Sequence, residues 1–423
     1  MGRRLCAAGR TTRLSGGIQA VSRIDWKELY STVGAGLKPS PIRELMKYTR
    51  QPGMISFAGG NPDPAIFPVA EFGRASTILT ERGREVLQYG ATDGFAPLKE
   101  YIAQWMAPRM GRVTTSEEML ISTGSQQVMD LLCSALVDAG DYVIVEEPTY
   151  PGSIHTMRNH RVSFLTCPCD EEGMVVDAIP ALVERARKEG KKVKFIYTIV
   201  NFHNPAGVTL SVERRRKLLE IASKEGILIF EDDPYGHLRY DGDHLPTIFS
   251  MDNEGLVLFA CSFSKILAPG TRVAWSVGDR ELIRSLVMVK QGVDLCTSVV
   301  AQALVYEYCR QGNLEGFLPK IVAHYGRKRD AMAAAFAKYL PADVRFVKPE
   351  GGFFFWLTLP GVDTKELFFK AIERNVAFVT GTSFFPSGKG GEENLRSCFT
   401  FASTEEIDEG ARRLAQAIAD LKG

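Results

Sequence analysis

Charged and amide side chains follow several short apolar runs of this sequence. Lys265 stands at the end of one run, the acids Glu231, Asp232 and Asp233 end another, and Asn204 follows a third. A lysine amine can form an imine with an aldehyde and can move a proton, and a carboxylate can hold a positively charged group. Each feature also has a plain explanation, since the lysine could reach the surface and the acids could cap a helix or lie in a solvated loop. Three adjacent acids at the end of a buried strand would be costly without partners.

A loop of small residues, Thr123–Gln127, precedes a helical pattern. Free N–H groups and the positive end of a helix dipole favour an anion at such a place. The loop is therefore either a phosphate site or an ordinary capped turn. It matches neither GxGxxG nor GxxxxGK[ST], and the glycine-rich stretch 387–391 also lacks the second spacing, so we interpret that stretch as a surface turn.

The elements that position these residues alternate between apolar strands and helices. A helix is expected at 127–137, and another from an N-cap at Ser211 to a stop at Gly226. The expected strands are 119–122, 142–146, 194–200, 227–231, 256–261 and 273–277. This alternation favours an α/β fold with a mostly parallel, buried sheet. Ligands of such sheets bind at the carboxyl ends of strands, which is where the polar residues fall.

The last hundred residues follow another pattern. Residues 313–340 and 405–421 are helical in composition, whereas 353–359 and 395–401 are strand-like. We expect a second, smaller α+β domain here, joined by the segment up to about Pro68.

Together, the polar residues at the strand ends match the needs of one cofactor. Pyridoxal 5′-phosphate (PLP) requires an amine for an imine, an acid beside its ring nitrogen, donors for its phosphate and a donor for its phenolic oxygen. A lysine, an aspartate, hydroxyl or guanidinium groups with a helix N-terminus, and an asparagine or tyrosine meet these needs.

Three motifs carry a family resemblance. Ser262-x-x-Lys265 is followed seven residues later by Arg272, and Asn204-Pro205-x-Gly207 and Asp232-x-x-Tyr235 precede it. With these motifs in this order, the chain from about Lys38 to its end resembles the fold-type-I aminotransferases. It is similar to the subgroup of 2-aminoadipate, kynurenine and broad-specificity aromatic or branched-chain aminotransferases.

The resemblance implies a fold and a division into domains. It implies a mostly parallel, seven-stranded sheet in a large PLP-binding domain, residues 75–312, and a smaller α+β domain, residues 38–74 and 313–423. Residues 1–37 are then an N-terminal extension, which is too short for the DNA-binding domain of an aminotransferase-like regulator.

The resemblance also implies roles for the cofactor-binding residues. Lys265 would hold PLP as a Schiff base, Asp232 would pair with the pyridine nitrogen, and Tyr150 would stack on the ring. Asn204 and Tyr235 would contact the phenolic oxygen. The residues expected at the phosphate are Ser125, Gln126, Ser262 and Arg272, with Tyr89 reaching it from the neighbouring subunit of a homodimer.

Three further residues would meet the substrate. Arg396 would grip the α-carboxylate, because a guanidinium suits a planar carboxylate. Gly60 would contribute a backbone contact, and Arg43 would lie in a mobile entrance segment. Two positions depart from the family pattern: Ala206, where threonine is common, and Asn61, which is often apolar.

The expected activity is ping-pong transamination between an α-amino acid and a 2-oxo acid such as 2-oxoglutarate. Asp232, Lys265 and Tyr235 are the expected catalytic set. The alternative is another PLP reaction on the same fold, a lyase or a decarboxylase. The sequence does not identify the amino acid substrate.

Composition narrows the class of protein. The 51 basic and 50 acidic residues nearly cancel, which argues against general binding to nucleic acid or membranes. No apolar run approaches the ~20 residues that span a bilayer. The eight cysteines show no metal-binding spacing, so we expect no metal and a cytoplasmic enzyme with reduced cysteines.

The arginine-rich first 24 residues, which contain no acid, could instead be an organelle-targeting peptide, a disordered tail or the product of an early start codon.

Overall fold

The computed structural model describes residues 11–13, 19–21, 24–36 and 51–422, and the chain forms two compact units, residues 1–40 and 41–423. In the first unit, β1 (Thr11–Arg13) pairs antiparallel with β2 (Gln19–Val21), and the short helices α1 (Trp26–Leu29) and α2 (Thr32–Gly36) follow. The candidate site lies in the second unit. The predicted domain boundaries at residues 37, 74 and 312 stay predictions.

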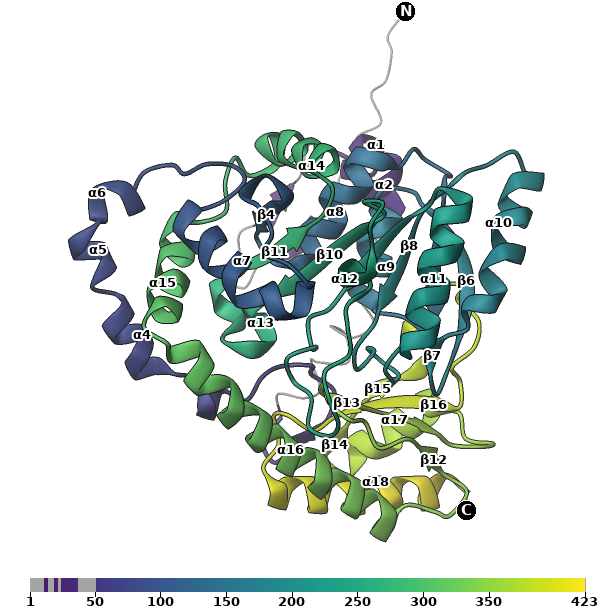
Figure 1. Ribbon diagram of the computed structural model, residues 1–423. Helices are drawn as coiled ribbons and strands as arrows, with labels where there is room; N and C mark the ends of the chain where they lie inside the picture. Colours follow the sequence, from purple (N-terminus) through teal and green to yellow (C-terminus); the bar gives the residue numbers. More distant parts are fainter. Residues whose placement is uncertain (1–10, 14–18, 22–23, 37–50, 423) are drawn as a thin grey trace, which may run out of the picture. The chain divides into compact units, whose positions relative to one another are not determined.

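An eight-stranded sheet runs through the second unit (Figure 1), in the order β4-β11-β10-β9-β8-β5-β6-β7. Its strands are β4 (Met119–Ser122), β5 (Tyr142–Glu147), β6 (Ser163–Asp170), β7 (Gly173–Met174), β8 (Val193–Ile199), β9 (Leu228–Asp232), β10 (Val257–Ser262) and β11 (Ala274–Val277). The neighbours from β10 to β6 are parallel, whereas β11 is antiparallel to both of its neighbours. The α/β class and the mostly parallel sheet are confirmed. The two-residue strand β7 adds an antiparallel edge to the seven expected strands.

Helices cover both faces of this sheet, which explains why its strands are apolar on both sides. One face packs against α8 (Ser125–Leu136), α9 (Pro151–Asn159) and α14 (Arg280–Val293). The other face packs against α7 (Ala96–Met110), α10 (Ile179–Lys188), α11 (Val212–Glu225) and α12 (Ile248–Met251). Successive side chains of a strand point to opposite layers.

Local signals set the helix ends as expected. The side chain of Ser211 accepts a hydrogen bond from the N–H of Arg214 at the start of α11, and Gly226 ends that helix in the left-handed conformation. Helix α8 begins at Ser125, two residues before the predicted start, because Gly124 adopts a φ of 86° that is open to glycine and lets the chain turn directly into the helix.

Strand β6 was not predicted from the sequence. Its apolar and polar residues alternate only weakly, and Pro168 interrupts the pattern. Proline is tolerated there because β6 lies near the sheet edge, where only the two-residue β7 covers it.

A second, four-stranded antiparallel sheet, in the order β12-β13-β16-β15, lies next to three helices (Figure 1). Its strands are β12 (Arg345–Phe346), β13 (Phe354–Thr358), β15 (Val379–Thr380) and β16 (Asn394–Cys398), and the helices are α16 (Asn313–Tyr339), α17 (Thr364–Glu373) and α18 (Thr404–Lys422). The strands and helices expected in this region are confirmed. A separate pair joins β3 (Ile55–Ser56) to β14 (Val376–Ala377).

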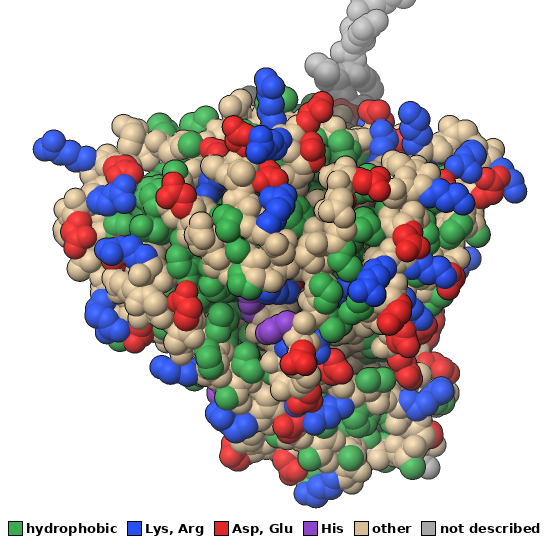
Figure 2. All heavy atoms as spheres, in the orientation of Figure 1, with side chains coloured by type: hydrophobic (Ala, Val, Ile, Leu, Met, Phe, Trp, Pro, Cys, Tyr) green, Lys and Arg blue, Asp and Glu red, His purple; other side chains and the backbone are tan. Residues whose placement is uncertain are grey.

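Five further described helices belong to the second unit. They are α4 (Val69–Ala75), α5 (Ile78–Glu81), α6 (Gly83–Val86), α13 (Phe263–Ile266) and α15 (Val299–Arg310). In the described part of the chain, no helix has the length and apolar character needed to cross a membrane. Basic and acidic side chains are interspersed on the face seen in Figure 2.

Candidate active site

Lys265 lies in the one-turn helix α13, directly after β10 at the carboxyl edge of the large sheet. Its Nζ donates a hydrogen bond of 2.9 Å to the carbonyl oxygen of Gly60. Burial, followed by the charges of Arg396 and Arg272, lowers the pKa of this amine to about 8, while Cys398 opposes the shift. A large fraction of the amine is therefore neutral, and so nucleophilic, at mildly alkaline pH.

Asp232 is the last residue of β9 and is 6% exposed. Its Oδ2 accepts a hydrogen bond of 2.8 Å from the hydroxyl of Tyr197, whereas its buried Oδ1 has no partner among the described residues. Burial raises the pKa of this carboxyl to about 7; the bond from Tyr197 lowers it, and the charges of Asp233 and Glu146 raise it. The free oxygen is thus a ready acceptor for a positively charged N–H group.

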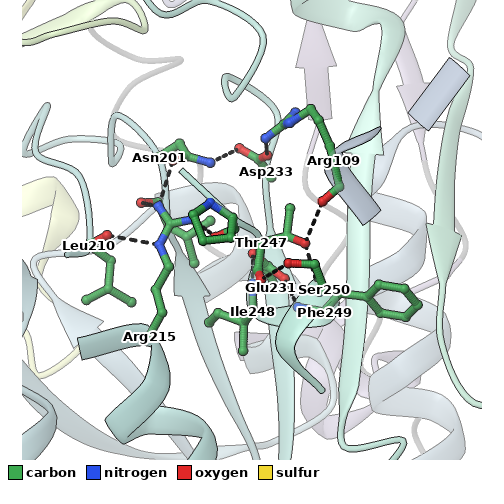
Figure 3. Close-up of polar contacts among 12 residues, drawn as sticks. Arg109, Asn201, Leu210, Arg215, Glu231, Asp233, Thr247, Ile248, Phe249 and Ser250 are labelled. Atoms are coloured by element: carbon green, nitrogen blue, oxygen red, sulfur yellow. Dashed lines mark hydrogen bonds and ion pairs between the residues drawn. The ribbon is translucent and has the colours of Figure 1, made fainter. Parts of the chain in front are cut away.

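The two neighbouring acids point to the other face of the sheet, as the period of a strand requires. Glu231 accepts hydrogen bonds of 2.9 Å from the N–H groups of Ile248 and Phe249, at the start of α12. Asp233 accepts bonds of 2.6 Å from Arg109 and 2.8 Å from Asn201 (Figure 3). The helix-cap interpretation therefore holds for Glu231, an ion pair satisfies Asp233, and Asp232 alone of the three keeps an open oxygen.

Arg396, on β16, is 3% exposed and joins Asn204, another predicted site residue, to the second sheet. Its Nη1 donates to Oδ1 of Asn204 at 2.9 Å and its Nη2 to the carbonyl oxygen of Ala58 at 2.7 Å. The guanidinium carbon lies 4.2 Å from the ring centre of Phe354 and 5.0 Å from that of Phe384. Two aromatic faces thus flank a cation whose Nε is buried without a partner in the described structure.

Gly124 and Arg272 approach each other where β4 and β11 lie side by side. Nη2 of Arg272 is 3.3 Å from the carbonyl oxygen of Thr123, and a Cβ atom on Gly124 would lie 2.0 Å from Nη2. Gly124, the N-cap residue of α8, has no side chain that could cap the helix, whose first two residues are Ser125 and Gln126. The guanidinium of Arg272 and the uncapped N-terminus of α8 form a site for an anion, which we call the anion cradle. Only a glycine at position 124 leaves this site open.

Two hydroxyl groups complete this cradle. The Oγ of Ser262 accepts the N–H of Ser264 and donates to Oγ of Ser264 at 2.8 Å. Nη1 of Arg272 is 3.4 Å from the same Ser264 oxygen. Gln126, by contrast, is exposed and donates its side-chain amide to Thr156 at 3.1 Å.

Two tyrosines border the same edge of the sheet. Tyr150 immediately precedes α9, and a Cβ on Gly152 would lie 2.5 Å from its ring, so the ring lies close against that turn. Tyr235 is 4% exposed, with its ring centre 5.5 Å from Phe353 and 5.9 Å from Phe354. Burial is the main cause that raises the pKa of both hydroxyls, which therefore keep their protons.

Two predicted residues remain, Tyr89 and Arg43. Tyr89, which follows α6, is 79% exposed. Arg43 falls outside the described residues, so its role stays a prediction.

The structure adds residues that the sequence did not single out. Tyr197 contacts Asp232, Ser153 contacts Tyr197, and Ser264 contacts Arg272. Tyr197 could have been found from alternation, because it lies on the same face of β8 as Ile199, which pairs in register with Asp232.

The donors and acceptors fit PLP. Lys265, Arg272 and Arg396 supply three cationic groups, and Asp232 supplies an orphaned anionic oxygen. A molecule with a phosphate group, a cationic ring nitrogen and an aldehyde would use the cradle at Gly124, the open Oδ1 of Asp232 and the amine of Lys265.

Comparisons with known proteins agree with this chemistry. The sequence profile of "Aminotransferase class I and II" matches residues 53–414. The aromatic-amino-acid aminotransferase 1 of Thermococcus litoralis is 41% identical, over 94% of this chain and 95% of that protein. The multiple substrate aminotransferase from Thermococcus profundus superposes with a TM-score of 0.90 at 41% identity, over 94% of this chain and 99% of the other.

The α-aminoadipate aminotransferase of Thermus thermophilus was solved in complex with N-(5′-phosphopyridoxyl)-L-leucine. It superposes with a TM-score of 0.87 at 38% identity, over 94% of this chain and 99% of the other. The chain belongs to the class I and II aminotransferases and is a PLP-dependent amino acid transaminase.

Proposed function

We propose that this enzyme moves an amino group between 2-oxoglutarate and an α-amino acid by a ping-pong reaction. The amino acid is 2-aminoadipate or one with an aromatic or branched-chain side chain. The observation that carries the proposal is the convergence of Lys265, Asp232, Asn204 and Arg396 at one sheet edge. The activities for which the similar proteins are named, together with the leucine adduct of the Thermus thermophilus enzyme, support this substrate range.

Each residue would contribute one task. When bound, PLP supplies the aldehyde that takes up the amino group and a ring that accepts negative charge. The amine of Lys265, held by the Gly60 carbonyl, would move the proton of the substrate Cα. The open Oδ1 of Asp232 would keep the ring nitrogen protonated, because a close carboxylate favours the charged form.

The anion cradle would hold the phosphate. Arg272 and Ser262 would donate from one side, and the N-terminus of α8 at Ser125 and Gln126 from the other. Tyr150 would cover the ring face.

Arg396 would bind the α-carboxylate of every substrate. Its Nη1 and Nη2 now donate to Asn204 and Ala58, and the flanking rings of Phe354 and Phe384 keep its plane fixed. Asn204 would thereby link the arginine to the phenolic oxygen of the cofactor, which Tyr235 would also contact. Gly60 would add a backbone contact close to the substrate.

We also propose a homodimer in which Tyr89 completes the phosphate site of the other subunit. The support is its exposure of 79%, high for an aromatic side chain, beside the exposed Leu87. Sedimentation with assay tests this, and full activity of a monomer at nanomolar concentration would overturn it.

For specificity, we propose that Arg43 pairs with the distal carboxylate of glutamate or 2-aminoadipate and moves away for apolar side chains. One charge-assisted contact is worth roughly 1.5–3 kcal/mol, or about ten- to a hundredfold in kcat/KM. Arg43→Ala should weaken dicarboxylic substrates by that factor and spare leucine and phenylalanine. Equal losses for both classes would assign Arg43 to the fold.

A panel of single amino acids tests the reaction itself. With PLP-loaded enzyme and no second substrate, each accepted amino acid should release at most one equivalent of its 2-oxo acid per subunit. Adding 2-oxoglutarate should restart the release. Continued turnover without an acceptor, with loss of carbon dioxide or of the side chain, would favour the alternative of a decarboxylase or a lyase.

A further inference from the structure

Tyr197 and Ser153 form a short chain of hydrogen bonds that ends on Asp232. The hydroxyl of Tyr197, on β8, donates to Oδ2 of Asp232 at 2.8 Å, and Oγ of Ser153 donates to the Tyr197 hydroxyl at 2.9 Å. Tyr197 is 0% exposed and Ser153 5%. The three residues come from β9, β8 and the first turn of α9.

The direction of this chain follows from the acceptor at its end. An ionised carboxylate can only accept hydrogen bonds, so the single proton of the Tyr197 hydroxyl must point to Asp232. Ser153 must then donate to the phenol oxygen. Burial, followed by the charge of Asp232, raises the pKa of Tyr197, which keeps the phenol neutral and able to donate.

The surroundings make this donor important. Burial and the charges of Asp233 and Glu146 disfavour an ionised Asp232, whereas the hydrogen bond from Tyr197 favours it. Other titratable groups whose pKa values respond to the charge of Asp232 are Tyr150, Tyr235 and Cys261. None of these groups is a cation, so among the described residues Tyr197 is the group whose hydrogen bond stabilises this carboxylate.

The bond to Tyr197 also fixes how the carboxylate is turned. One oxygen is held by Tyr197, which leaves Oδ1 as the open oxygen. Ser153 follows Tyr150 by three residues, so both belong to the same turn. This turn carries the tyrosine predicted to stack on the ring, and it also fixes the direction in which the Tyr197 hydroxyl donates its proton.

We propose that Tyr197, oriented by Ser153, is a positioning residue that keeps the Asp232 carboxylate ionised and turns one oxygen toward the cofactor's ring nitrogen. This rests on the role of Asp232 proposed above. Because the bond acts through Asp232 and not through Arg396, it should govern cofactor affinity and the proton-transfer step, and leave recognition of the substrate carboxylate unchanged.

The test compares Tyr197→Phe with Tyr142→Phe. Both changes remove one hydroxyl that donates to a carboxylate, but Tyr142 begins β5 at the opposite sheet edge and donates to Glu189. Tyr197→Phe should weaken PLP binding to the apoenzyme by roughly tenfold, the value of one charge-assisted bond. It should lower kcat by a similar factor with little change in KM, and Tyr142→Phe should leave all three constants unchanged.

A pH series separates positioning from a structural role. Affinity for PLP should fall as pH falls and Asp232 takes up a proton. In Tyr197→Phe the fall should begin at higher pH, because the group that lowers the pKa of Asp232 is gone. A lower melting temperature of the apoenzyme with an unchanged pH profile would show that the hydroxyl only supports the fold, and would overturn the proposal.

Two further variants locate any failure. Ser153→Ala should have a weaker effect of the same kind, and none when added to Tyr197→Phe, because Ser153 acts through the phenol. If Asp232→Asn abolishes turnover while Tyr197→Phe equals Tyr142→Phe, the positioning proposal fails and the proposed function stands. If Asp232→Asn is itself mild in the PLP-affinity and turnover assays, the proposed role of Asp232 fails.

Discussion

Nη1 of Arg396 donates a hydrogen bond of 2.9 Å to Oδ1 of Asn204, a residue 192 positions earlier in the chain. The contact joins the loop that follows β8 of the large sheet to β16 in the small one. The guanidinium is thus held in one plane before any substrate arrives, and preorganisation of this kind reduces the ordering cost of binding.

Arg396→Lys should therefore raise KM for every amino acid and 2-oxo acid by about ten- to a hundredfold, because a point charge cannot replace a bidentate fork. Steady-state kinetics with leucine, glutamate and 2-oxoglutarate check this. Arg413→Lys is a matched control, since Arg413 donates to the carbonyl oxygens of Gly53 and Asn375 at the surface. Losses confined to one substrate would assign Arg396 to the side chain instead of the carboxylate.

Lys265→Ala should abolish turnover, because it removes the amine that would form the imine and move the proton. Borohydride reduction of the PLP-loaded wild-type enzyme, followed by peptide mass analysis, should find the phosphopyridoxyl group on Lys265. The exposed Lys389→Ala is the control for both measurements. A modified lysine elsewhere in the chain would refute the assignment.

The lowered pKa of Lys265 gives a pH prediction for the apoenzyme. Below about pH 8 the side chain is a non-nucleophilic ammonium, and above it a free amine, so acylation should rise with a midpoint near pH 8. A free lysine reacts with a midpoint near pH ~10.4. Competitive labelling with acetic anhydride measures the midpoint directly. In Arg272→Gln it should move upward, because the charge of Arg272 lowers this pKa; an unmoved midpoint would contradict that cause.

Asp232→Asn and Asp233→Asn should separate chemistry from folding. Asp232→Asn should slow the release of 2-oxo acid by roughly a hundredfold or more with little change in apoenzyme stability, because an amide cannot hold a protonated ring nitrogen. Asp233→Asn breaks the buried pair with Arg109 and should lower the free energy of unfolding by about 3 kcal/mol. Single-turnover rates and denaturant titrations give the two values, and a reversed pattern would exchange the two roles.

Gly124→Ala should weaken PLP binding by about tenfold or more. The new Cβ would lie 2.0 Å from Nη2 of Arg272, and a φ of 86° is strained for alanine. Gly270→Ala provides the control, since it lies two residues before Arg272 and its Cβ would meet nothing within 4 Å. Dialysis against PLP measures both affinities, and equal values would show that Arg272 does not depend on an open position at 124.

Much of the site could be predicted because its residues break an apolar pattern. Lys265, Asp232 and Asn204 stand out at the ends of buried strands, and the topology of a parallel sheet brings such ends to one edge. Arg396, Ser262 and Arg272 came from the family resemblance, which fixed their register where periodicity alone could not.

The partners of these residues do not break the apolar pattern, so they stand out less in the sequence. Tyr197 sits inside an apolar strand, where an aromatic residue normally belongs to the core. Asp233 is neutralised by Arg109, 124 positions earlier, and a pairing of that range depends on how α7 packs on the sheet. Strand β6 was missed because its alternation is weak and a proline interrupts it.

The alternation of β9 also constrains how this protein can evolve. A side-chain exchange leaves the alternation of the strand intact, but an insertion or deletion of a single residue within 228–232 would shift every later side chain to the opposite face. After a deletion, Asp233 would take the place of Asp232 without its ion pair to Arg109, and Asp232 would lose its bond from Tyr197. Changes in length should therefore accumulate in the surface segment 241–246, where the chain has already left the sheet, and be absent from the strand itself.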